Sequence, residues 1–402
     1  MSLELSKKII DLRGSKTLQL QEKIIKLKKE GKNIIAFTVG EPNFNTPSEI
    51  KEAAKTAIDN NYTKYTAVTG IDELKEAISA KFKTENNINY NIDNIVVSNG
   101  GKQCLMNALT AIINEGDEII IPSPYWLSYS QMVLLAGGNP IIVECKPRNN
   151  YKITAKQLSD RITPRTKAII LNSPNNPTGM IYSKRELLEI SRVIAANKIY
   201  VISDEIYEYL NYTNEKHCSI ASLGDDIFEQ TITINGLSKS YAMTGWRIGY
   251  LGAPIRIVKL INKIQSQYTS NVCSIVQKAA VKALSGSKDS INQMINIYRK
   301  RRDLLIKMLD KLPYISYIKP DGAFYILIDF SNIINFIYGN KSITSSNDIA
   351  NILLDNYGVA VIPCDDFGIQ NCIRLSYSLG EADIVEGIEK IRDFLMEVVC
   401  QD

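Results

Sequence analysis

Hydrophobic and polar positions follow two alternating patterns along the first two thirds of the chain. Short apolar runs predict buried strands at Ile34–Val39, Ile95–Val97, Glu118–Pro122, Pro140–Glu144, Lys167–Leu171 and Tyr200–Asp204. Between them, apolar residues at helical spacing predict helices such as Thr17–Gly31, Pro47–Asn60 and Lys184–Asn197. Buried strands separated by helices favour an α/β fold with a mainly parallel sheet covered on both faces.

The pattern changes after Pro254, where the chain becomes strongly helical. A long helix is predicted around Ser290–Leu312, and three strands are predicted at Ala323–Ile328, Val359–Ile362 and Cys372–Tyr377. We interpret Arg299, Arg301 and Arg302 as a solvent-exposed basic face of the long helix. We therefore expect an N-terminal segment over residues 1–45, a large domain over 46–290 and a small α+β domain over 291–402.

The composition of the chain excludes some classes of function but does not identify one. The chain has 402 residues, 45% hydrophobic and 22% charged, with a net charge of +4. These values are ordinary for a globular protein and do not indicate a nucleic-acid partner. We find neither an apolar run long enough to cross a membrane nor a secretory signal. Seven cysteines without a C-x-x-C pair favour a reducing cytoplasm and give no structural zinc motif.

The chain has a single histidine, His217. This excludes most catalytic triads and multi-histidine metal sites. Its polar neighbours, Asn214 to Lys216, predict an exposed loop. If the protein is an enzyme, its proton transfers need another group.

Polar candidate residues follow several predicted strands. Gly40, the stretch Gly100–Lys102, the stretch Asn172–Pro177 and Asp204 come directly after apolar runs. The carboxyl ends of parallel strands meet at one edge of a sheet, where ligands gather. Backbone amides at a helix start after the glycine pair could bind an anion there.

The stretch Gly236–Tyr250 places Lys239 among small and hydroxyl residues. A lysine in a mostly apolar setting is costly unless it loses its charge or bonds covalently, and a Schiff base with an aldehyde cofactor does both. Ser238 and Arg247 are suitable phosphate ligands. The alternative is a buried lysine paired with a carboxylate and an arginine in a structural salt bridge.

Four segments together resemble the class I aminotransferases: Asn172–Gly179, Ser203–Tyr207, Gly236–Tyr250 and Ile373–Tyr377. The resemblance extends over nearly the whole chain. It implies a fold type I enzyme that depends on pyridoxal 5′-phosphate (PLP), with a seven-stranded sheet in the large domain. The segments Glu41–Pro42, Gly100–Gln103 and Ser123–Trp126 are most similar to a bacterial branch that acts on aspartate and, in some members, prephenate.

By this resemblance, Lys239 is the Schiff-base lysine and proton carrier, and Asp204 keeps the cofactor ring nitrogen protonated. Tyr207 and Asn176 would hydrogen-bond the ring oxygen, and Trp126 would stack on the ring. Further residues bind the phosphate: Gly101, Lys102, Ser238, Arg247 and, from the second subunit of a homodimer, Tyr65.

The resemblance also assigns substrate contacts. Arg374 would bind the α-carboxylate, with Gly40, Trp126 and Asn176 nearby. Lys102 would meet the distal carboxylate, its alternative being a helix-start lysine that faces water. The N-terminal stretch would close over the substrate, and Arg13 matches an arginine associated with prephenate use, although Gly14 follows it where relatives often have proline.

The implied reaction is transfer of the amino group of L-aspartate to 2-oxoglutarate, with prephenate as a further substrate. Three alternatives remain open: an alanine or aromatic aminotransferase, a related PLP lyase or synthase, and a non-catalytic module that binds an effector.

Overall fold

The fold is given by a computed structural model that describes residues 5–10, 12, 14 and 16–401. Its largest sheet has seven strands in the order β2-β8-β7-β6-β5-β3-β4. Five neighbours pair in parallel: β7 (Thr231–Gly236), β6 (Tyr200–Asp204), β5 (Thr166–Asn172), β3 (Glu118–Ser123) and β4 (Asn139–Glu144). Strand β8 (Gly249–Gly252) is antiparallel to both β7 and β2 (Ile95–Ser98). The predicted mainly parallel α/β sheet is confirmed.

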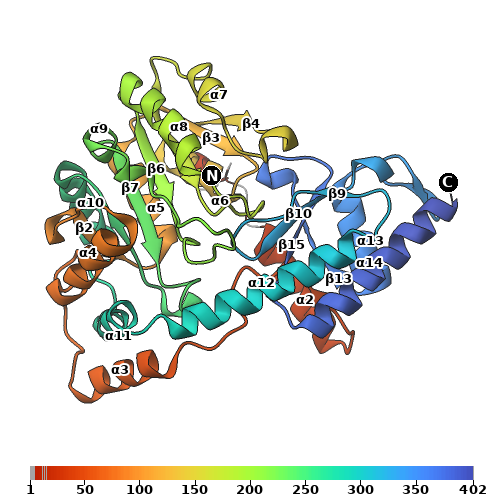
Figure 1. Cartoon of the computed structure of the whole chain (residues 1–402), viewed down its shortest axis with the longest axis horizontal. Helices are drawn as coiled ribbons and strands as arrows, with labels where there is room; N and C mark the ends of the chain where they lie inside the picture. Colours follow the sequence, from red (N-terminus) through yellow and green to blue (C-terminus); the bar gives the residue numbers. More distant parts are fainter. Residues whose placement is uncertain (1–4, 11, 13, 15, 402) are drawn as a thin grey trace, which may run out of the picture.

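Helices cover both faces of this sheet (Figure 1). Successive residues of β3 point to opposite faces, so Ile119 and Ile121 pack in one core and Ile120 in another. The first core includes residues of α5 (Gly101–Ile112), α6 (Ser128–Ala136) and α10 (Ile255–Tyr268); the second includes residues of α7 (Ala155–Ser159) and α8 (Lys184–Asn197). Burial on both faces explains why these strands read as continuous apolar runs.

The C-terminal part contains a smaller antiparallel sheet in the order β14-β15-β10-β9. Its strands are β14 (Ile362–Pro363), β15 (Cys372–Ser376), β10 (Tyr325–Asp329) and β9 (Ser316–Tyr317). Helices α12 (Asp289–Leu309), α13 (Ser346–Tyr357) and α14 (Glu381–Gln401) pack against it. The predicted strand Val359–Ile362 is divided, because β13 (Val359–Ala360) pairs with β1 (Ile35–Ala36) instead of β15.

The N-terminal part contains α1 (Lys7–Ile10) and α2 (Lys16–Lys29). Through β1, residues near the start of the chain pack beside the C-terminal sheet. Helices α3 (Ser48–Asp59), α4 (Asp72–Asn86) and α11 (Ser274–Ser285) form a further group at the β2 edge (Figure 1). We keep residues 46 and 291 as proposed domain boundaries.

The interpretation of α12 as a helix with a solvent-exposed basic face is wrong for two arginines. Arg301 and Arg302 are buried. The Arg301 guanidinium donates to the Asn43 side-chain oxygen at 2.7 Å, and that of Arg302 lies 4.9 Å from the Tyr212 ring centroid. The Arg302 guanidinium also donates to the Pro320 carbonyl oxygen at 3.2 Å and pairs with Asp303 at 2.8 Å, so both guanidinium groups have protein partners in place of solvent. Among the described residues, none of the helices has the length and apolar character needed to cross a membrane.

Candidate active site

A cavity of about 480 Å³ lies where the carboxyl ends of the parallel strands approach the small sheet. Most of the residues selected from sequence line it: Gly40, Gly101, Lys102, Trp126, Asn176, Asp204, Tyr207, Ser238, Lys239, Arg247 and Arg374. Tyr65 is not among the lining residues and is 91% exposed. Arg13 lies outside the residues that the structure describes.

Lys239 follows β7 and its amine points to the cavity wall formed by Gly40. Its Nζ donates a hydrogen bond to the Gly40 carbonyl oxygen at 2.5 Å and lies 5.9 Å from the Tyr207 ring centroid. Burial lowers the pKa of Lys239 to about 8; Glu41 opposes this shift, and the positive charges of Arg374 and Arg247 add to it. A lysine with this pKa can present an unprotonated amine near neutral pH, as nucleophilic and proton-transfer chemistry requires.

Asp204 ends β6 and is 5% exposed. One carboxylate oxygen accepts a hydrogen bond from the Tyr129 hydroxyl at 2.6 Å, and the other accepts from the Ile206 amide at 3.3 Å. Burial raises the pKa of Asp204 to about 6 despite these bonds. A carboxylate in this position would be stabilised by a cationic N–H donor in the cavity.

Arg374 lies on β15 and is 3% exposed. Its guanidinium donates to the Asn176 side-chain oxygen at 3.1 Å and to the Thr38 carbonyl at 3.0 Å, and it lies 4.4 Å from the Tyr325 ring centroid. Its Nε is buried and has no hydrogen-bond partner among the described residues. A buried guanidinium with a free donor on a cavity wall is suited to bind a carboxylate.

The start of α5 brings together groups that could bind an anion. Gly100 has φ 86°, a backbone conformation that favours glycine, and a Cβ there would lie 2.6 Å from a guanidinium nitrogen of Arg247. Arg247 donates to the carbonyl oxygens of Thr244 and Asn99 at 2.9 and 3.3 Å. Ser238, Arg247 and the first residue of α5, Gly101, line the cavity together. Hydroxyl, guanidinium and helix amides at one place suit a phosphate.

Lys102 follows directly in the first turn of α5. It is exposed as a residue, yet its Nζ lies 4.9 Å from the Trp126 ring centroid, and both residues line the cavity. Burial of part of the side chain, with the nearby charge of Arg247, lowers its pKa. The geometry favours a cation at the cavity over the alternative in which Lys102 faces only bulk water.

Sequence reasoning missed two tyrosines at the cavity. Tyr129 donates to Asp204, and the Tyr325 hydroxyl lies 2.9 Å from that of Tyr207. Tyr129 follows Trp126 by three residues, and its backbone amide donates to the Trp126 carbonyl oxygen at 2.9 Å in the turn that begins α6, so this spacing could have indicated it. Tyr325 lies within an apolar strand, and nothing in its local pattern distinguishes it from a core residue.

The predicted exposed loop is present, since Asn214 to Lys216 are exposed, but the His217 side chain at its end turns inward. That side chain is 9% exposed, and its Nε2 lies 2.9 Å from a carboxylate oxygen of Glu205. The buried carboxylate of Glu205, which directly follows β6, provides a partner that the polar neighbours of His217 did not indicate.

Comparison with known proteins gives the family. The model of "Aminotransferase class I and II" matches residues 32–391. The chain belongs to the class I and II aminotransferases. It is 45% identical to a probable aspartate/prephenate aminotransferase of Rickettsia bellii, over 93% of this chain and 94% of the relative.

Two solved structures agree with this family. The aspartate aminotransferase of Rhizobium meliloti has a TM-score of 0.96 at 37% identity, over 99% of this chain and all of that chain. The Thermus thermophilus aspartate aminotransferase with maleate has a TM-score of 0.92 at 38% identity, over 98% and 100% of the two chains. The fold is therefore fold type I, and this class I/II aminotransferase is a PLP-dependent enzyme.

The cavity residues fit PLP by their chemistry. Ser238, Arg247 and the start of α5 suit its phosphate, and the buried carboxylate of Asp204 suits a protonated ring nitrogen. Lys239 supplies an amine for the aldehyde. Each polar end of the cofactor therefore has a matching group on the same cavity wall.

Proposed function

We propose that this aminotransferase moves the amino group of L-aspartate to 2-oxoglutarate, and that prephenate is a further substrate. One observation carries the proposal: Arg374 and Lys102, two cations, line the same cavity as Lys239. A dicarboxylic substrate needs one cation for each carboxylate. The names of relatives that act on aspartate or prephenate, and a structural neighbour with maleate, are consistent with a dicarboxylic ligand.

We assign the cofactor contacts to residues of this chain. Ser238, Arg247 and the backbone at Gly101 and Lys102 would hold the phosphate, and Asp204 would hold the ring nitrogen. Tyr207 and Asn176 would bind the ring oxygen, and Trp126 would stack on the ring. When bound, PLP supplies an aldehyde that joins to amines and a ring that accepts electrons from the substrate α-carbon.

The residues of the chain then provide binding and proton transfer. Arg374 binds the substrate α-carboxylate as a fork, and its contact with Asn176 fixes the orientation of the guanidinium. Gly40 and Trp126 complete this end of the cavity, and Lys102 binds the distal carboxylate. The Lys239 amine would take the proton from the substrate α-carbon at Nζ and pass it to the aldehyde carbon (C4′) of the cofactor, which the lowered pKa of this lysine permits. Tyr129 donates to Asp204 and so keeps that carboxylate aimed into the cavity.

We further propose a cytoplasmic homodimer with shared active sites. Tyr65, 91% exposed and outside the cavity of its own chain, would bind the phosphate in the partner. The seven cysteines are free thiols, as is usual in a reducing compartment. The N-terminal stretch with Arg13 would cover the bound substrate.

A visible absorbance spectrum of the purified protein, titrated with amino acids, tests the proposal. L-Aspartate should bleach the band of the bound cofactor, and 2-oxoglutarate or prephenate should restore it. Bleaching by L-alanine or L-phenylalanine but not by aspartate would refute the role of Lys102 and favour an alanine or aromatic aminotransferase.

Two further results would contradict the proposal. Release of a product other than the oxo acid would indicate lyase or synthase chemistry at this site. A protein with no cofactor band after addition of PLP would refute the assigned cofactor contacts. For the aminotransferase, initial-rate lines at several oxo-acid concentrations should be parallel.

A further inference from the structure

A second group of charged side chains lies at the end of β6, outside the cavity. Asp204 and Tyr207 line the cavity, whereas their sequence neighbours Glu205 and Glu208 do not. Glu205 and Glu208 are only 1% and 5% exposed. The end of β6 and the turn after it therefore present three residues, Asp204, Ile206 and Tyr207, to the cavity and two carboxylates to the protein interior.

Glu205 is held by three side-chain contacts. One of its oxygens accepts hydrogen bonds from the hydroxyls of Ser203 at 2.8 Å and Ser219 at 2.6 Å. The other lies 2.9 Å from Nε2 of His217. Its backbone amide donates to the Ile234 carbonyl on β7 at 2.9 Å. Glu205 thus joins β6, β7 and the loop around His217.

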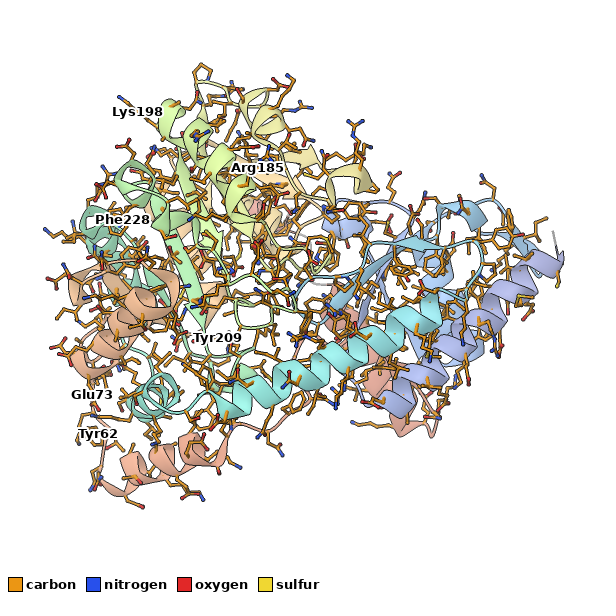
Figure 2. All side chains as sticks on the ribbon, viewed as in Figure 1. Tyr62, Glu73, Arg185, Lys198, Tyr209 and Phe228 are labelled. Atoms are coloured by element: carbon orange, nitrogen blue, oxygen red, sulfur yellow. The ribbon has the colours of Figure 1, made fainter. Side chains whose placement is uncertain are left out.

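Glu208 connects the same turn to α4. Its carboxylate contacts the ammonium group of Lys81 and accepts a hydrogen bond from Asn86 at 2.7 Å. Its backbone amide donates to the Glu205 carbonyl at 3.0 Å. The ring of Tyr209, labelled in Figure 2, lies 5.5 Å from the Lys81 ammonium. Tyr207 therefore lies in a turn with one anchored carboxylate on either side.

The charges in this group balance only if His217 carries a proton. Two buried carboxylates face one buried ammonium group, that of Lys81, whose side chain is 1% exposed. An uncompensated buried carboxylate is strongly destabilising. Burial by itself lowers the pKa of His217, but the hydrogen bond and charge of Glu205 and the charge of Glu208 outweigh burial and Lys81, so the pKa is raised.

Glu205, Glu208 and His217 are of residue types that bind metal ions, and their ligand atoms lie within 4.8 Å of one another. The ammonium of Lys81 already contacts Glu208, and the imidazole already contacts Glu205. These two groups supply the positive charge that a metal ion would bring.

We propose that His217, as an imidazolium bound to Glu205, is a positioning residue that holds Asp204 and Tyr207 in their places on the cavity wall. This inference rests on the proposed roles of Asp204 and Tyr207. Burial is the main cause of the raised pKa of Asp204, and the negative charge of Glu205 adds to it; a neighbouring imidazolium offsets that charge. Without it, Asp204 would hold a proton of its own more readily and pair less well with a protonated ring nitrogen.

The histidine itself gives the first test. Because it is the single histidine of the chain, the holoenzyme labelled with ¹⁵N,¹³C-histidine gives one set of imidazole NMR signals. We expect an imidazolium at pH 7, with a titration midpoint above the ordinary value of about 6.5. A neutral imidazole at pH 7 would overturn the proposal whatever the catalytic function is.

Three variants test the positioning role. His217→Ala removes charge and donor, His217→Gln keeps a neutral donor at the Nε2 position, and Lys216→Gln removes a neighbouring charge from an exposed side chain. Loss of a hydrogen bond to a charged group predicts a fall in kcat of about tenfold for His217→Ala, with the KM for aspartate within about twofold. We expect partial recovery in His217→Gln and no change in the Lys216→Gln control.

A spectroscopic readout separates positioning from simple stabilisation. In His217→Gln, the pH at which the cofactor band changes on acidification should be higher than in the wild type. The reason is that Asp204 then lies beside a Glu205 whose negative charge no imidazolium offsets. A lower melting temperature together with wild-type kcat and a wild-type pH titration would show a purely structural histidine and refute the proposal. Wild-type protein without a cofactor band would refute the proposed function instead, while the NMR result would still decide the charge of His217.

Discussion

Replacing Asp204 with asparagine should stabilise the cofactor-free protein and damage catalysis. The carboxyl group is buried, and burial raises its pKa from 3.8 to about 6. Asparagine has the same shape and carries no charge to desolvate; its one side-chain oxygen can accept from the Ile206 amide while its NH2 donates to the Tyr129 hydroxyl oxygen. Asp204→Asn therefore removes an electrostatic cost that the wild-type protein tolerates for its function.

The magnitude and its pH dependence follow from this pKa. A carboxyl that binds its proton more tightly when folded contributes most to stability at low pH, and that contribution is lost as pH rises from about 4 to about 6. The shift corresponds to about 3 kcal/mol at pH 7 and about half of that at pH 5. With an unfolding entropy of about 2 cal/mol/K per residue, 3 kcal/mol raises the Tm of a chain this long by about 3–4 °C.

Thermal unfolding of cofactor-free wild type and Asp204→Asn at pH 5, 6 and 7 measures this effect. The variant should have the higher Tm at pH 7, and the difference should become smaller toward pH 5. Asp93→Asn, at an exposed carboxylate, is the matched control and should show no such trend. With PLP and substrates, Asp204→Asn should lose roughly 10²–10³-fold in kcat, the cost of removing one preorganised charge from a water-excluded site. A variant that is equally stable at all three pH values would refute the argument from burial.

Three further substitutions test the proposed site. Arg374→Lys keeps the charge but loses the guanidinium fork. The apparent Kd for aspartate in the bleaching titration should therefore rise roughly 30- to 150-fold, equivalent to about 2–3 kcal/mol. The control Arg185→Lys, at an exposed position labelled in Figure 2, should leave this Kd unchanged. Lys239→Ala should abolish turnover and leave the circular dichroism spectrum unchanged, and turnover without added amine would contradict its role as proton carrier. Tyr129→Phe removes one hydrogen bond to Asp204, so the acidic limb of the cofactor band's pH titration should move to higher pH; an unmoved limb would show that this bond does not tune Asp204.

Local sequence signals predicted five of the seven strands of the main sheet and much of the cavity, whereas β7 and β8 were not predicted. Helix α8 has the predicted bounds Lys184–Asn197, and the strands before Asp204 and Asn176 lie where the apolar runs predicted them. These strands are buried on both faces, so every residue in them carries the hydrophobic signal. Because parallel strands end at one edge, the polar residues that follow them were expected to meet, and Gly101, Asn176 and Asp204 all line one cavity.

The sequence by itself therefore determined the α/β sheet, the motifs of the cavity and the resemblance to class I aminotransferases. Only the tertiary structure decided which distant residues complete that site: Arg374 reaches Asn176 and Thr38 because β15 packs beside the end of the main sheet, and Lys239 reaches the carbonyl of Gly40. It also decided that His217 is buried against Glu205. The physical reason is that the environment of a charged side chain depends on partners far away in sequence, whereas local hydrophobic periodicity reports only the face that an element buries.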